Sequence, residues 1–71
     1  MVKNIYKKIK ILRKQNNFSQ EYIAEQLDLS RQTYMQIENG ERELTISEAK
    51  KIASIFGVSF ENFIKDSIPT P

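Results

Sequence analysis

The sequence contains no cysteine and no histidine, and these two absences remove several kinds of chemistry. Without a thiol or an imidazole the chain has no thiolate nucleophile, no histidine base, no disulfide framework and no thiol-based zinc site. A chain of 71 residues buries only about 60% of the surface that it exposes when unfolded, which allows one compact core and no deep cleft. We therefore expect a single domain that is not an enzyme and that holds no metal or cofactor.

Long apolar runs are absent as well. Residues 1–15 carry many charges and never assemble the stretch of about 7 to 15 apolar residues that a signal peptide needs. No later segment approaches the length of about 20 apolar residues that spans a membrane as a helix. We therefore expect a cytoplasmic protein that does not contact a membrane, and the lack of cysteine fits a reducing interior.

Positive charge is concentrated at the amino-terminal end. The net charge is only +2, yet residues 1–14 contain six of the 11 basic residues and no acidic residue. This asymmetry indicates that one side of the protein meets a polyanion, with a solvated basic helix face as the alternative. The six residues are Lys3, Lys7, Lys8, Lys10, Arg13 and Lys14.

Apolar spacing and capping residues predict three helices in the first half of the chain. Apolar residues recur at i, i+4 and i+7 from Ile5, which predicts an amphipathic helix over residues 3–15. A serine is placed to cap each of the next two helices, which we expect over residues 20–26 and 30–39. Gly40, which can take a positive φ, is expected to end the third helix.

Two further helices are predicted in the second half. Thr45 and Glu48 have the spacing of a capping box at the start of a fourth helix, and Ser59 is placed to cap a short fifth helix. Residues 66–71 have no core pattern and are expected to form a flexible tail or the stub of a linker. The residues expected to face the core are Ile46, Ala49, Ile52, Ala53 and Phe56 in the fourth helix and Phe60, Phe63 and Ile64 in the fifth.

Residues 20–37 have the pattern of a helix-turn-helix. Two short helices joined by about three residues need a small residue where they cross and a turn residue between them, and Ala24 and Asp28 fill these places. On a helical wheel Tyr34 and Ile37 turn inwards together. The polar side chains on the other side can form bidentate hydrogen bonds with guanine or adenine, and a methyl group there can touch thymine. The side chains predicted to contact base edges are Arg31, Gln32, Thr33, Met35 and Gln36.

Four segments of the chain carry a family pattern, namely FSQE at 18–21, IAEQL at 23–27, LSRQT at 29–33 and IENGER at 37–42. With them, residues 5–64 resemble the lambda-repressor-like family of phage and bacterial regulators, also called the Cro/C1-type or Xre helix-turn-helix family. The resemblance implies an all-α, compact five-helix DNA-binding domain, which we place over residues 1–65. It also implies a bacterial or phage-encoded protein.

The resemblance further implies roles for residues that the helical wheel does not assign. Arg13 and Glu38 match a pair that forms an internal salt bridge between the first and third helices. The residues that would hold the DNA backbone are Gln20, Ser30, Asn39 and Arg42.

The sequence departs from the family pattern at several positions. Asn17 and Asp28 stand where glycine is usual, so both must enter the left-handed region, which Asn and Asp tolerate better than most residues. Tyr34 replaces the usual Ile or Val, and its ring is expected to enter the core only if its hydroxyl finds a partner or water. Ile11 and Ile55 fall outside the core arcs and are candidates for a protein interface.

These features predict a sequence-specific transcriptional regulator, in particular a repressor, that places the helix over residues 30–39 in the major groove. A homodimer on an inverted-repeat operator is expected, because two half-sites about 34 Å apart add their discrimination. One alternative is the antitoxin of a toxin-antitoxin pair, which would also bind a toxin. The other is the DNA-binding module of a longer regulator with a fused effector domain.

Overall fold

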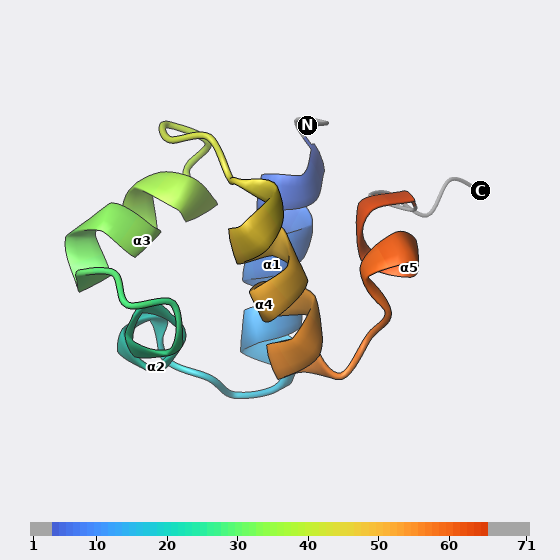
Figure 1. Cartoon of the computed structure of the whole chain (residues 1–71). Helices are drawn as coiled ribbons and strands as arrows, with labels where there is room; N and C mark the ends of the chain where they lie inside the picture. The colour runs from blue at the N-terminus through green and yellow to red at the C-terminus, as the bar shows by residue number, and fades with distance from the viewer. Residues whose placement is uncertain (1–3, 66–71) are drawn as a thin grey trace.

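The computed structural model describes residues 4–65, which form five α-helices and no strand (Figure 1). The predicted all-α fold is therefore confirmed, while the predicted tail over residues 66–71 lies outside the described residues. None of the helices in the described part is long and apolar enough to cross a membrane. The helices are α1 (Asn4–Gln15), α2 (Gln20–Gln26), α3 (Arg31–Glu38), α4 (Ile46–Phe56) and α5 (Phe60–Lys65).

The predicted capping residues begin the last four helices. The side-chain oxygens of Ser19 and Ser30 accept hydrogen bonds from backbone N–H groups in the first turns of α2 and α3. Thr45 and Glu48 form the predicted capping box at α4, in which each side chain accepts a hydrogen bond from the other residue's backbone N–H. At the start of α5, the Ser59 hydroxyl oxygen accepts a hydrogen bond from the backbone N–H of Asn62. Because these side chains satisfy backbone donors that a helix start leaves free, they set where each helix begins.

A residue with positive φ ends each of the first four helices. At the end of α2, Asp28 has φ 59°, and the N–H of Leu29 donates to the carbonyl of Ala24 at 2.9 Å, which is the long-range bond of a Schellman motif. Glycine fills this place after α3 and α4, whereas α1 and α2 use Asn and Asp. The sequence departures at these two positions are therefore accommodated by the left-handed backbone, as expected. The four residues are Asn17, Asp28, Gly40 and Gly57.

The core lies where α1 packs against α3 and α4. α2 also packs against α3, and α5 packs against α4. The pair of α1 and α4 therefore lies in the middle, with α2 and α3 on one side of it and α5 on the other (Figure 1). All five helices contribute apolar side chains, which bury the surface that drives folding. The buried apolar residues are Ile5, Ile9, Ile23, Ala24, Leu27, Tyr34, Ile37, Leu44, Ala49, Ile52, Ala53 and Phe63.

Two expectations about apolar residues were wrong. Ile46 was expected to face the core but is 63% exposed, because it is the first residue of α4 and the buried place at this end belongs to Leu44, which is 5% exposed. Leu44 and Ala49 stand on either side of the Thr45 cap at the spacing of a hydrophobic staple. Ile55 was expected outside the core but is partly buried against it, whereas Ile11 is 50% exposed, as expected.

Candidate nucleic-acid interface

The two sides of α3 differ in the way that the helical wheel indicates. Tyr34 and Ile37 are fully buried, whereas Arg31, Gln32 and Gln36 are exposed. None of these three exposed side chains has a hydrogen-bond or ion-pair partner among residues 4–65, so their polar groups are available to an outside ligand. Met35 is partly exposed and joins Ser30, Arg31 and Gln32 in lining an open surface hollow at the start of α3.

The start of α3 is held by a reciprocal contact between Ser30 and Thr33. The Ser30 hydroxyl oxygen accepts a hydrogen bond from the Thr33 backbone N–H at 3.1 Å and donates its own proton to the Thr33 hydroxyl at 2.8 Å. Thr33 was predicted to contact a base, and the structure uses its hydroxyl internally. Its methyl group is therefore the part left for a contact with thymine.

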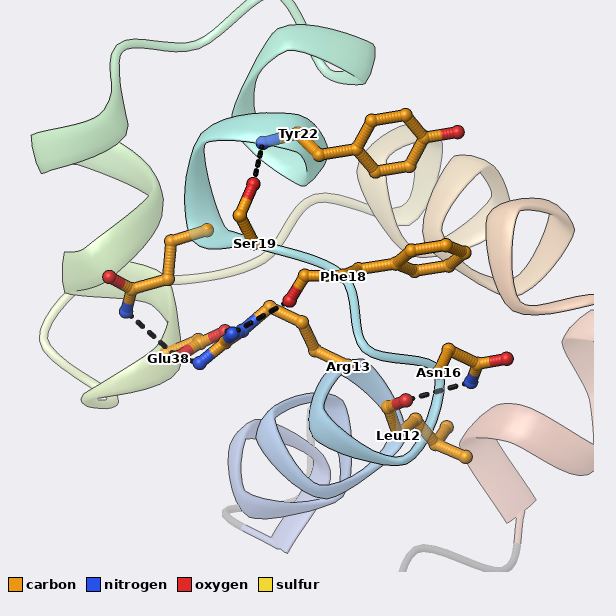
Figure 2. A network of polar contacts seen from close by, with 8 residues as sticks. Leu12, Arg13, Asn16, Phe18, Ser19, Tyr22 and Glu38 are labelled. Carbon is orange, nitrogen blue, oxygen red and sulfur yellow. Dashed lines mark hydrogen bonds and ion pairs between the residues drawn. The ribbon is translucent and has the colours of Figure 1, made fainter.

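An ion pair between Arg13 and Glu38 joins α1 to α3 (Figure 2). The Arg13 Nε donates to Glu38 Oε2, and Nη2 donates to Oε1 at 3.3 Å. The remaining guanidinium nitrogen, Nη1, donates to the carbonyl of Phe18 at 2.9 Å, so the same arginine also holds the turn before α2. The Glu38 side chain is only 1% exposed, which makes this a buried charge pair.

Glu38 also accepts a hydrogen bond from Gln20, the first residue of α2, with 3.1 Å between Gln20 Nε2 and Glu38 Oε1. Burial alone would raise the pKa of the Glu38 carboxyl. The hydrogen bonds from Arg13 and Gln20 favour the ionised form, and they hold its pKa below the ordinary value. Gln20 was predicted to contact a DNA phosphate, and one N–H of its amide remains without a partner in the described part of the chain.

The Tyr34 ring is fully buried in the core, and the expectation that a partner or water satisfies its hydroxyl stays a prediction. Its hydroxyl is buried close to Arg13 and Glu38, yet it forms no hydrogen bond of ordinary geometry with any residue from 4 to 65. Burial and the Glu38 carboxylate both raise the pKa of this hydroxyl, so it stays protonated.

Arg42, predicted to hold the DNA backbone, forms a bidentate ion pair within the protein. Its Nη1 and Nη2 atoms lie 3.1 and 3.0 Å from Glu48 Oε1 and Oε2. Burial would raise the pKa of the Glu48 carboxyl, but the hydrogen bonds from Arg42 and from the Thr45 backbone lower it. Arg42 thus ties the turn after α3 to the first turn of α4, a role that the sequence did not reveal.

Comparison with known proteins also identifies a helix-turn-helix protein. A family model described as helix-turn-helix matches residues 9–63 of the chain. The chain belongs to this helix-turn-helix family. An uncharacterized HTH-type transcriptional regulator of Methanocaldococcus jannaschii is 42% identical over 55 residues, which cover 78% of this chain and 83% of that protein. The control protein C.MunI of a Mycoplasma species is 38% identical over 60 residues, covering 83% of this chain and 81% of that protein. No solved structure matches the chain significantly.

Within the helix-turn-helix, the structure separates the predicted DNA-contacting residues into two groups. The exposed side chains of α3 have no internal partner, whereas Gln20 and Arg42 each bind a glutamate that the sequence did not identify as their partner. Asn39, the C-cap of α3, is exposed. The described residues contain no cluster of three or more His, Cys, Asp or Glu side chains that could hold a metal ion.

Proposed function

We propose that this protein is a sequence-specific DNA-binding transcriptional regulator that contacts base edges with α3 in the major groove. The observation that carries the proposal is the row of exposed side chains of Arg31, Gln32 and Gln36 on the second helix of the helix-turn-helix, none of which has a partner within residues 4–65. The two relatives support it, since one is named as an HTH-type transcriptional regulator and the other as a control protein.

The dimensions of α3 suit the major groove. An α-helix with its side chains is about 10 to 12 Å in diameter, and the major groove of B-form DNA is about 12 Å wide, so α3 can enter it side-on. Gln32 and Gln36 are four residues apart and therefore lie on one face of the helix, with Arg31 beside Gln32 at its start. Ser30 and Asn39 flank α3 at its two ends, where they are expected to meet the phosphates on either side of the groove.

We also propose that two copies of the protein bind an inverted repeat and repress transcription there. One α3 presents only three exposed polar side chains to the bases, so it discriminates among few base pairs. Two half-sites whose centres lie about 34 Å apart combine this discrimination. A dimer bound across a promoter occupies DNA that the transcription machinery needs, and we therefore expect repression.

The test is selection of bound duplexes from a random pool, followed by titration at fixed salt. The proposal predicts an enriched inverted repeat with half-sites about 10 to 10.5 base pairs apart, centre to centre, or a multiple of that spacing. The full repeat should bind more tightly than one half-site. Recovery of no common sequence would overturn sequence-specific binding, and equal affinity for half-site and full repeat would overturn the dimer alone.

A further inference from the structure

A groove runs between α1 and the end of α3, and we call it the α1-α3 groove. Its lining residues are Tyr6, Lys7 and Lys10 from α1 and Glu38, Asn39 and Gly40 from the end of α3. The Tyr6 ring lies against Gly40, where an added Cβ would be 3.6 Å from the ring atom Cδ2. The groove therefore places two lysines next to Asn39, the C-cap of α3, at which a backbone contact is predicted.

The basic residues of α1 do not all have the same surroundings. Lys8 donates to the carbonyls of Asn62 and Phe63, each at 3.3 Å, and so ties α1 to α5. Arg13 is paired with Glu38. By contrast, Lys7 and Lys10 are both exposed and are bound to no other residue in the described part of the chain.

The charge of the groove is set by these two lysines. Glu38 also lines it, but its carboxylate is buried and neutralised by Arg13. The acidic residues of the next turn, Glu41 and Glu43, do not line the groove. Two positive charges that form no ion pair within residues 4–65 thus stand beside the end of the helix that is proposed to enter DNA.

We propose that Lys7 and Lys10 bind phosphates of the DNA backbone, which makes α1 a second phosphate-contacting element beside the helix-turn-helix. This inference rests on the proposed DNA-binding function. A phosphate held near Asn39 would lie at the same groove as both lysines, and charges within about 8 Å of one another are only partly screened at physiological salt. Lysine ammonium groups on flexible stems suit such a contact, because a phosphate demands charge and not a fixed direction.

The competing explanation is that the lysines stabilise the negative end of the α3 dipole. The carbonyls of Gln36 and Ile37 at that end already have partners, because the N–H groups of Glu41 and Gly40 donate to them at 2.8 and 3.0 Å. Less partial negative charge therefore remains at the end of α3 for the lysines to stabilise. The two explanations differ in their consequences. Loss of a dipole interaction lowers the stability of the folded protein, whereas loss of a phosphate contact changes the salt dependence of DNA binding.

The experiment compares two double variants with the same change in charge. The test variant is Lys7→Gln with Lys10→Gln, and the control is Lys51→Gln with Lys65→Gln, which removes exposed lysines from α4 and α5. α3 and α5 lie on opposite sides of α1 and α4 (Figure 1), so the substitution in α5 is far from α3. Binding to the selected duplex and to a scrambled duplex is titrated at several salt concentrations, and thermal unfolding is followed for every variant.

The inference predicts that the test variant lowers the slope of log K against log salt by about 1.8, since each lost phosphate contact removes about 0.9. The control should leave the slope nearly unchanged, and the ratio of specific to random affinity should stay constant in both. Replacing single phosphates of the selected duplex with neutral methylphosphonates should then weaken wild type at one or two positions where the test variant is insensitive. Lys7→Arg with Lys10→Arg should restore the slope.

Equal slopes in the test and control variants, or no methylphosphonate position at which they differ, would overturn the inference while wild type still binds its selected sequence. A change in unfolding temperature with no change in slope would do the same and favour the dipole explanation. If wild type itself shows no preference for any sequence, the proposed function fails instead, and the two failures are therefore distinguishable.

Discussion

Glu38, the last residue of α3, accepts a hydrogen bond from Gln20, the first residue of α2, with 3.1 Å between the amide nitrogen and the carboxylate oxygen. This contact turns the Gln20 amide so that one N–H is used internally and the other remains for a ligand. The same carboxylate binds Arg13 of α1. One buried group thus fixes the start of α2, the end of α3 and the last turn of α1 relative to one another.

Losing one partner of the Arg13 and Glu38 ion pair should lower stability more than losing both. Arg13→Met leaves the Glu38 charge buried without its cationic partner, which should lower the free energy of unfolding by roughly 3 to 5 kcal/mol. Replacing both residues, by Met and Leu, should cost less than the single change. Urea unfolding of the three proteins measures this, and an Arg13→Met protein as stable as wild type would contradict it.

Stability should also fall at acidic pH. The pKa of Glu38 is lower in the folded protein than its ordinary value of about 4.3, so the folded state favours the ionised form. This contribution is fully present above the unfolded pKa and is lost as pH falls through the folded pKa. The free energy of unfolding should therefore decline progressively below about pH 4.3. Glu48, whose pKa is also lowered, contributes in the same direction.

The control for this pH dependence is Glu48→Gln, which leaves the buried pair intact. It should remove the smaller part of the decline, because the ion pair with Arg42 is less buried than the pair with Arg13. If the decline in stability at acidic pH vanishes in Glu48→Gln, the effect comes from Glu48 and not from Glu38, which would contradict the prediction. Urea unfolding between about pH 3 and pH 7, a range that brackets ordinary carboxyl pKa values, measures both proteins.

Tyr34→Phe should leave the domain as stable as wild type or make it more stable. The change removes a buried hydroxyl that has no hydrogen bond in the described structure and keeps the ring that fills the core. Removing an unsatisfied polar group recovers up to about 1 to 3 kcal/mol, whereas removing a satisfied one loses about 1 kcal/mol. Thermal and urea unfolding decide between these signs, and a loss above about 1 kcal/mol would show that the hydroxyl is hydrogen-bonded.

The local parts of this fold could be predicted from the sequence. Helix starts follow from Ser19, Ser30 and Thr45, and each of these caps acts on an N–H within three residues. The left-handed positions at Asn17 and Asp28 are likewise local, since they depend on what a single residue tolerates. The two sides of α3 follow from helical periodicity alone.

The parts that could not be predicted depend on partners brought together by folding. Gln20 and Glu38 are 18 positions apart, and no pattern along the chain indicates that an amide at the start of one helix meets a carboxylate at the end of the next. Arg42 and Glu48 form an ion pair across the bend before α4. Gln20 and Arg42 were expected to contact DNA because the family resemblance implies it, and nothing in the neighbouring sequence indicates their partners within the protein.

Arg42 should hold DNA through its charge, even though Glu48 binds it in the free protein. Arg42→Ala should weaken binding to selected and scrambled duplexes alike and reduce the salt slope by about one unit, because one fewer counterion is released. Its effect on stability should be below about 1 kcal/mol, since the Arg42 side chain is 31% exposed. Glu48→Gln is the matched control. It breaks the ion pair but keeps the cation, so its salt slope should match wild type, and equal slopes in all three proteins would make Arg42 purely structural.

Arg31 and Gln36 should determine sequence preference, because contacts to base edges carry sequence information that phosphate contacts lack. Arg31→Ala or Gln36→Ala should weaken binding to the selected sequence by about 1 to 3 kcal/mol with much less change on a scrambled duplex. Each variant should also relax the preference at one base pair in each half-site. The measurement is a titration of both duplexes at several salt concentrations, with Arg42→Ala as the variant that lowers both affinities equally. If Arg31→Ala and Gln36→Ala also lower both affinities equally, α3 is not the element that distinguishes one sequence from another.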